Sequence, residues 1–404
     1  MVKQQKRNKW IRPRHKFGKI LVSLYAVPKM KRKYGVKVTP FKDQKRQYLV
    51  LFNHQTAYDQ FFVSWAFRKQ HLYYVATEDL FSLGFVSKII KYVVAPIPIK
   101  KQTTDSRAVM TCAKVVKEGG SIAMAPEGNR TFSGKTEYIK ESLVKLIRLL
   151  KLPIAIFIIE GGYGVHPRWS DVVRKGKLTA GVKQVIEYEE YSRLTDDELY
   201  QLIKTALYVN ECKLDYEYKS KKTAEYLERA IYVCPHCGLT TYYSQNDWII
   251  CSRCGKKVQY LPTKELRGVG HDFPFTFVND WYEYQNDFIR KADLSVYKDK
   301  PAYVDTVKFS KVFLYKNKRV LSTSAEISLY FDKITMFDGV RGMTFNFDSV
   351  DAVTVLGKNK VNIYCKDSVY QIKGDFRFNA LRYVHFYHKY KNLVGGGNNE
   401  FLGL

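Results

Sequence analysis

His54 and Asp59 lie five residues apart and have the side chains of a base and its orienting partner. A histidine that removes a proton from a hydroxyl near neutral pH needs one free ring nitrogen, so an acceptor must keep the proton on the other nitrogen. The apolar run 48–52 predicts a strand before His54, and a helix that starts near Thr56 would place Asp59 in its first turn. There the carboxylate can fold back onto the imidazole. Taken alone, the pair is better explained by a helix cap after an ordinary histidine.

The loop residues Glu127, Gly128 and Arg130 form a second group. They follow the small and apolar run 121–125, which predicts a buried strand. In α/β folds the loops at the carboxyl ends of such strands carry the site. Lys101 ends the apolar segment that lies between the two groups, and an arginine fork with a lysine point charge suits a phosphate. Together with the histidine and the aspartate, these residues predict the transfer of an acyl group to a hydroxyl.

Residues 45–190 resemble the glycerolipid acyltransferase family, whose best-known member is 1-acylglycerol-3-phosphate acyltransferase. The joint presence of His-x4-Asp and Glu-Gly-x-Arg at this separation is the most specific part of the resemblance. Four blocks occur in the order of the family, at residues 53–59, 95–101, 127–130 and 152–154. The resemblance implies an α/β core in which helices flank a central mixed sheet.

By this resemblance His54 is the general base and Asp59 is its partner. The acceptor-binding residues that it implies are Lys101, Glu127, Gly128 and Arg130. The expected O-acyltransferase moves a fatty acyl group from acyl-CoA or acyl carrier protein to the free hydroxyl of a lysophospholipid in phospholipid biosynthesis, and the acceptor we expect is 1-acylglycerol-3-phosphate. Because position 101 has lysine where the family has arginine, and the two are not equivalent at a bidentate site, an acyltransferase for a non-phosphate glycolipid is an alternative.

Four of the seven cysteines have the spacing of a zinc ribbon. Cys234 and Cys237 form one Cys-x2-Cys pair, and after a 13-residue gap Cys251 and Cys254 form another. A glycine follows each pair and permits a tight turn that aims both thiolates at one ion. Four thiolates suit tetrahedral Zn²⁺ and leave no position open for water, so the predicted zinc is structural. Two disulfides are the alternative, but three further cysteines beside such a cluster indicate a reducing compartment.

The basic residues of the chain concentrate near its N-terminus. The formal net charge is +28, and residues 1–47 hold 16 Lys and Arg with one Asp, which gives +15. Phe17, Ile20 and Leu24 have helical spacing, and Pro28 is expected to end the helix. The apolar run is too short to span a bilayer. We therefore expect a cytoplasmic protein that lies peripherally on the anionic cytosolic face of a membrane; a helix that covers the core with a solubilising basic face is the alternative.

The sequence predicts an α/β acyltransferase core followed by a small zinc ribbon and a mostly-β domain. From residue 302, short alternating segments precede one helix, a pattern that resembles pleckstrin-homology and GRAM-type domains. The expected divisions are a basic amphipathic arm at 1–44, the acyltransferase domain at 45–213, a helical lead and zinc ribbon at 214–260, a linker at 261–301, the β domain at 302–392 and a disordered tail at 393–404. A zinc-ribbon protein that binds nucleic acid is the rival interpretation. It is disfavoured because residues 234–254 contain a single basic residue, Arg253.

Overall fold

The computed structural model describes residues 9–81, 84–99, 105–313, 316–366, 368–395 and 401–403. They fall into two units. The first comprises the chain up to Gly128 with Ile139–Glu160 and Leu178–Tyr208, and the second comprises Asn129–Tyr138, Gly161–Lys177 and the chain from Val209 onward. Because the chain leaves the first unit three times between residues 45 and 213, the segment expected to be one acyltransferase domain contributes to both units. Among the described helices, none has both the length and the apolar character that crossing a membrane requires.

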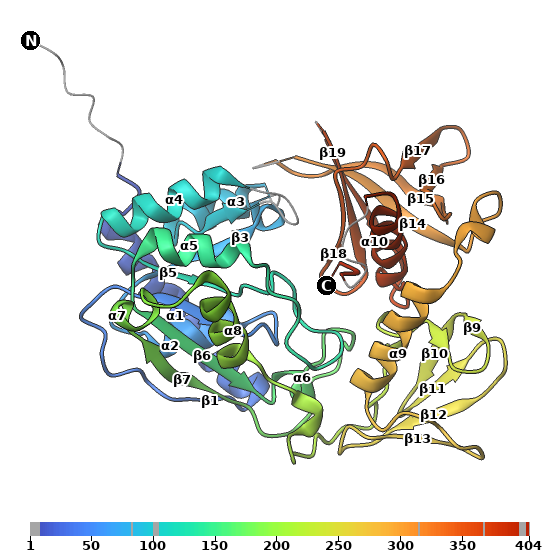
Figure 1. Ribbon diagram of the computed structural model, residues 1–404, viewed down its shortest axis with the longest axis horizontal. Helices are drawn as coiled ribbons and strands as arrows, with labels where there is room; N and C mark the ends of the chain where they lie inside the picture. Colours follow the sequence, from blue (N-terminus) through green and yellow to red (C-terminus); the bar gives the residue numbers. More distant parts are fainter. Residues whose placement is uncertain are drawn as a thin grey trace, which may run out of the picture. The chain divides into compact units, whose positions relative to one another are not determined.

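The first unit is built on a seven-stranded sheet with the order β1-β7-β6-β2-β5-β3-β4 (Figure 1). The central strand β2 pairs in parallel with both β5 and β6, while β7 runs antiparallel to β6. All four residues of β2 are buried, which explains its continuous apolar sequence. The strands are β1 Lys37–Val38, β2 Leu49–Phe52, β3 Leu72–Thr77, β4 Ile97–Ile99, β5 Ser121–Met124, β6 Ile154–Glu160 and β7 Thr179–Ile186.

Helices of the first unit pack against one another and against this sheet, which confirms the expected mixed α/β core. Helix α1 contacts α2 and α3, and α5 contacts α4 and α8. Local sequence sets several helix starts: Asp105 accepts a hydrogen bond from Ala108 N at the start of α4, and Thr195 forms a capping box at α8. The helices are α1 Pro13–Tyr34, α2 Asp59–Ala66, α3 Phe85–Val93, α4 Ser106–Lys117, α5 Ser142–Leu150, α7 Tyr188–Tyr191 and α8 Asp196–Leu207, with a 3₁₀ turn, η1, at Glu78–Phe81.

Helix α1 does not end at Pro28, as the sequence led us to expect. It continues to Tyr34 and stops at Gly35, which has the left-handed φ of 63° and donates its N–H to Lys31 O. A proline inside a helix removes one backbone hydrogen bond. Ala26, Met30 and Tyr34 are buried on either side of that break, so packing holds the two parts in one helix.

The second unit contains the cysteine pairs. Strands β8 Val233–Cys234 and β9 Gly238–Leu239 form a two-stranded hairpin, and four antiparallel strands follow, β10 Tyr242–Gln245, β11 Trp248–Cys251, β12 Lys257–Tyr260 and β13 Leu266–Gly268. The expected helical lead at 214–230 is wrong, because this stretch has only a short 3₁₀ turn, η3 Leu227–Arg229. Before it come the short helix α6 Gly162–Val165 and the 3₁₀ turn η2 Glu211–Lys213.

The expected linker at 261–301 is also wrong, since it contains β13 and the 14-residue helix α9 Val278–Lys291, followed by the 3₁₀ turn η4 Ser295–Tyr297. One face of α9 is buried, including Trp281 and Ile289. The Trp281 indole Nε1 donates to Val233 O at 2.9 Å, which ties α9 to the first cysteine hairpin. The spacing of these apolar residues is helical, so the sequence did contain the signal.

A mostly-β domain with a terminal helix closes the chain, as predicted. Its seven antiparallel strands have the order β17-β16-β15-β14-β20-β19-β18, and helix α10 packs against β18 and α9 (Figure 1). We call β14 to β20 with α10 the β-domain. Its elements are β14 Tyr303–Val312, β15 Arg319–Leu329, β16 Lys333–Phe337, β17 Gly342–Asn346, β18 Ala352–Leu356, β19 Lys360–Cys365, β20 Ser368–Lys373 and α10 Leu381–Gly395.

The predicted tail at 393–404 starts inside α10. Residues 393–395 are helical, and Leu402 is buried with 4% of its surface exposed. Residues 396–400 and 404 lie outside the described residues.

Candidate active site

His54 and Asp59 meet as the sequence predicted. His54 Nδ1 lies 2.8 Å from Asp59 Oδ2, and the carboxylate of Asp59 is fully buried while about a quarter of the His54 side chain is exposed. Asp59 is the first residue of α2 and also accepts from the backbone N–H groups of Gln55 and Thr56 and from the Thr56 hydroxyl at 2.6 Å. These donors hold the carboxylate in place. With its proton held on Nδ1, His54 can use Nε2 as a base.

Asn53 anchors the loop that carries His54. Its Nδ2 donates to Ile159 O at 2.8 Å, and its Oδ1 accepts from Ile159 N at 2.8 Å. The side chain thus continues the pairing of β2 with β6 by one step beyond the strand. Because Asn53 is fully buried, these two hydrogen bonds fix where β2 ends and the loop that carries His54 begins.

Glu127 links the two sequence motifs directly. Its Oε1 accepts from the backbone N–H of His54 at 2.7 Å, and only 8% of the residue is exposed. The sequence resemblance gave Glu127 an acceptor-binding role, and the structure adds a positioning contact that no sequence spacing would have revealed. Gly128 has a φ of 65°, and a Cβ there would meet nothing within 4 Å, so the backbone conformation rather than space favours glycine.

The two remaining predicted acceptor residues are Lys101 and Arg130. Lys101 lies outside the described residues. Arg130 belongs to the second unit, where its carbonyl oxygen accepts from Nη1 of Arg168 at 2.7 Å. Arg168 is 2% exposed, and its guanidinium lies over the ring of Phe132, 4.2 Å from the ring centroid. Burial and the nearby Arg130 lower the pKa of Arg168 to about 9. Sequence reasoning missed Arg168, because nothing in its glycine-rich surroundings signals a contact across 38 residues.

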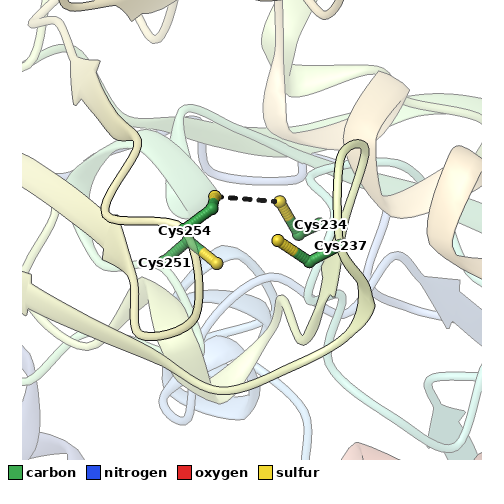
Figure 2. A group of neighbouring side chains, drawn as sticks. All are labelled: Cys234, Cys237, Cys251 and Cys254. Carbon is green, nitrogen blue, oxygen red and sulfur yellow. Dashed lines mark hydrogen bonds between the residues drawn. The ribbon is translucent and has the colours of Figure 1, made fainter.

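The four predicted zinc ligands come together at one point (Figure 2). Their sulfur atoms all lie within 4.8 Å of one another, and Cys234 Sγ is 3.9 Å from Cys254 Sγ. Tetrahedral Zn²⁺ with bonds of about 2.3 Å places its ligand sulfurs about 3.8 Å apart, so the donor set fits this ion. The glycines after both pairs have φ of 71°. All seven cysteines lie in the described residues and are free, so the described structure contains neither disulfide of the alternative.

Comparisons with known proteins bear on the domain that holds His54 and Glu127. Residues 33–160 match the protein-family model named Acyltransferase, and no curated protein matches the sequence. Among solved structures the chain is similar to the 1-acyl-sn-glycerophosphate (LPA) acyltransferase PlsC of Thermotoga maritima. The identity is 19% and the TM-score 0.41, with 49% of this chain and 80% of that chain covered. The matched residues 33–160 include both motif loops, so this part of the chain is an acyltransferase-type domain.

Proposed function

We propose that this acyltransferase moves a fatty acyl group from acyl-CoA or acyl carrier protein to the free hydroxyl of a lysophospholipid, with 1-acylglycerol-3-phosphate as the acceptor. The observation that carries the proposal is the 2.8 Å contact between His54 Nδ1 and the buried Asp59 carboxylate. It supplies an oriented base inside a domain of the acyltransferase family.

In the proposed reaction, His54 Nε2 accepts the hydroxyl proton while the hydroxyl oxygen attacks the thioester carbonyl. The tetrahedral intermediate collapses, the C–S bond breaks, and the imidazolium returns its proton to the leaving thiolate. General-base help of this kind contributes roughly 10²–10⁴-fold in rate. No acyl-enzyme forms, so thiol release should show no burst.

The acceptor phosphate is assigned to Arg130, with Lys101 as its partner. Arg130 follows Gly128 by two residues in the chain, and its planar fork suits two phosphate oxygens. Zn²⁺ is assigned to the four cysteines, where it would stabilise the ribbon and take no part in the reaction, since four thiolates complete its coordination.

We assign the membrane contact to two helices of the first unit. Helix α1 packs against α3, and the Arg14 guanidinium lies 4.1 Å from the ring centroid of Tyr92. Both helices expose large apolar side chains: Phe17, Ile20, Leu21, Leu24 and Tyr25 of α1, and Phe85, Val86, Ile89 and Tyr92 of α3. Lys31, Arg32 and Lys33 occupy the last turn of α1. An apolar face with adjacent cations suits an anionic membrane surface, on the cytosolic side if the compartment is reducing.

Purified full-length chain tests the activity when it is incubated with lysophosphatidate and acyl-CoA. We expect one thiol released per molecule of phosphatidate formed. A panel that adds monoacylglycerol and a glycolipid acceptor separates the alternatives, because turnover confined to the glycolipid would refute the phosphate-bearing acceptor. Absence of acyl transfer to every acceptor, with either thioester donor, would refute the proposed function.

The membrane assignment has its own test, which is sedimentation with vesicles. Vesicles that contain anionic lipid should carry the chain down, neutral vesicles should not, and Leu24→Asp should weaken binding. Phe337→Asp is the matched control, because Phe337 is 53% exposed but lies in the β-domain. Equal vesicle binding by wild type and Leu24→Asp would show that α1 is not part of the membrane-binding surface.

A further inference from the structure

Arg168 joins two parts of the second unit that are far apart in the sequence. Its Nη1 donates to Arg130 O at 2.7 Å, and its Nε donates to Gly357 O at 2.8 Å. Gly357 lies in the turn between β18 and β19, so one guanidinium holds the backbone of the predicted phosphate-binding residue and the backbone of the β-domain together. Only an arginine has a rigid fork that can donate in both directions from one planar group.

The β18–β19 turn is held at a second point as well. Lys358 Nζ donates to Ser170 O and to Asp171 Oδ1, the latter at 2.6 Å. Asp171 also pairs with Arg229 at 2.9 Å. Although burial acts in the opposite direction, hydrogen bonds from Arg229 and Lys358 lower the pKa of Asp171 to about 2, so it remains a carboxylate. The turn is therefore held at two points: Gly357 accepts from Arg168, and Lys358 donates to Ser170 and Asp171.

This region also brings several basic side chains together, with Asp171 as the carboxylate that pairs with two of them. Arg168 is buried next to Arg130. Burial lowers the pKa of Lys358; Asp171 acts against this shift, while Arg229 and Arg130 act in the same direction as burial. Glu137, seven residues after Arg130, is half-buried, and desolvation raises its pKa to about 7. Cations gathered in this way favour the binding of an anion.

We propose that Arg168 is a positioning residue for acceptor binding. Its guanidinium fixes the backbone of Arg130 against the β18–β19 turn, and through this contact the β-domain contributes to acceptor recognition. The inference rests on the proposed function, because it assigns Arg130 to the acceptor phosphate. It predicts that loss of the Arg168 fork lowers the affinity of the enzyme for phosphate-bearing acceptors and leaves the chemistry at His54 unchanged.

The test uses full-length chain with Zn²⁺ bound, and compares lysophosphatidate with monoacylglycerol as acceptors. Arg168→Lys keeps the charge but loses the fork. We expect its KM for lysophosphatidate to rise about tenfold to a hundredfold, with kcat and the KM for monoacylglycerol unchanged. Arg174→Lys is the matched control, because Arg174 is equally buried in the same segment but donates to Thr223 O.

Lys358→Met probes the turn without touching Arg168. We expect a smaller rise in the KM for lysophosphatidate, about threefold to tenfold. Arg341→Met, in the turn between β16 and β17, is its control and should leave that KM unchanged. An unchanged KM for lysophosphatidate in Arg168→Lys would overturn the inference. So would a lower Tm accompanied by a fall in kcat and a similar rise in the KM for both acceptors, because that pattern indicates a general loss of stability.

A second measurement keeps this inference separate from the proposed function. Hydrogen exchange of residues 129–138 should be about tenfold faster in Arg168→Lys than in Arg174→Lys, whatever the acceptor. If wild type does not acylate lysophosphatidate, the proposed function fails, and exchange still decides whether Arg168 positions this segment. If wild type is active and Arg130→Ala loses phosphate selectivity while Arg168→Lys matches wild type in KM and exchange, only the present inference fails.

Discussion

The His54 loop, residues 53–59, and the Arg130 segment, residues 129–138, are held in different ways. In the His54 loop the bonds that hold the Asp59 carboxylate on His54 join residues within five positions of one another, although Asn53 and His54 N also bond to distant Ile159 and Glu127. The Arg130 segment depends on Arg168 and, through it, on a turn 189 residues further along the chain. If the proposed roles hold, the orientation of His54 by Asp59 is fixed by local bonds, whereas the placement of Arg130 depends on the fold of the second unit.

Loss of the proposed metal should have the largest effect on stability, and it should affect the Arg130 segment before the His54 loop. A structural Zn²⁺ contributes on the order of 10 kcal/mol to folding. Cys251→Ser should therefore unfold the ribbon and loosen the Arg130 segment, which belongs to the same unit, so that the KM for lysophosphatidate rises before kcat falls. Thermal unfolding, zinc content and kinetics measure this, and Cys365→Ser is the control because Cys365 is outside the cluster. A loss of kcat with an intact fold would mean that the metal takes part in the chemistry.

Asp59→Asn should impair the function of the His54 loop and leave the Arg130 segment unchanged. The amide no longer favours the proton on His54 Nδ1, so we expect kcat to fall roughly 10²–10⁴-fold with little change in KM. Asp105→Asn is the matched control, since Asp105 also accepts a backbone N–H at a helix start and asparagine caps equally well. Steady-state thiol release measures both variants. A kcat within threefold of wild type would show that the tautomer is held by other means.

Glu137→Gln should change the pH dependence of stability in the Arg130 segment. Burial raises the pKa of Glu137 to about 7 from its ordinary 4.5, so folding favours the protonated form. This contribution is complete below about pH 4.5 and is lost as the pH rises to about 7, whereas glutamine stays neutral throughout. The variant should therefore gain stability relative to wild type between these pH values. Urea unfolding at pH 5 and pH 8 measures it, with the exposed Glu141→Gln as control. If the stability of wild type and of Glu137→Gln changed with pH in parallel, the raised pKa of Glu137 would be contradicted.

Gly128→Ala should have the smallest effect. Alanine has room at this position but must adopt a φ of 65°, which costs about 1–2 kcal/mol. Denaturant unfolding should show that loss, and activity should fall modestly because Glu127 is adjacent. Gly395→Ala is the control, as it also has space for a Cβ but has no positive φ. A stability equal to wild type would mean that the loop relaxes to another conformation.

The sequence was most informative where the deciding contacts are short. His54 with Asp59, and the two cysteine pairs, could be predicted because residue type and spacing carry the geometry. The mostly-β domain also followed from alternation, whereas the mixed sheet was implied by the family resemblance. Helix α9 lies where a linker was expected, although its apolar residues have helical spacing.

Contacts between distant segments could not be predicted. No property of residue 168 indicates that its guanidinium will bind the carbonyls of residues 130 and 357, since backbone acceptors are present at every position. The bond from His54 N to Glu127 is similar, because it depends on β2 and β5 being neighbours in the sheet. The continuation of α1 past Pro28 depended on the burial of Met30 and Tyr34, which only the tertiary structure determines.

The most direct test of the central claim is the turnover of His54→Ala beside wild type, with lysophosphatidate and acyl-CoA at saturation. If His54 is the base that Asp59 orients, kcat should fall roughly 10²–10⁴-fold, while the fold, the zinc content and the KM for lysophosphatidate stay as in wild type. Equal turnover by the two proteins would contradict the assignment of the chemistry to His54.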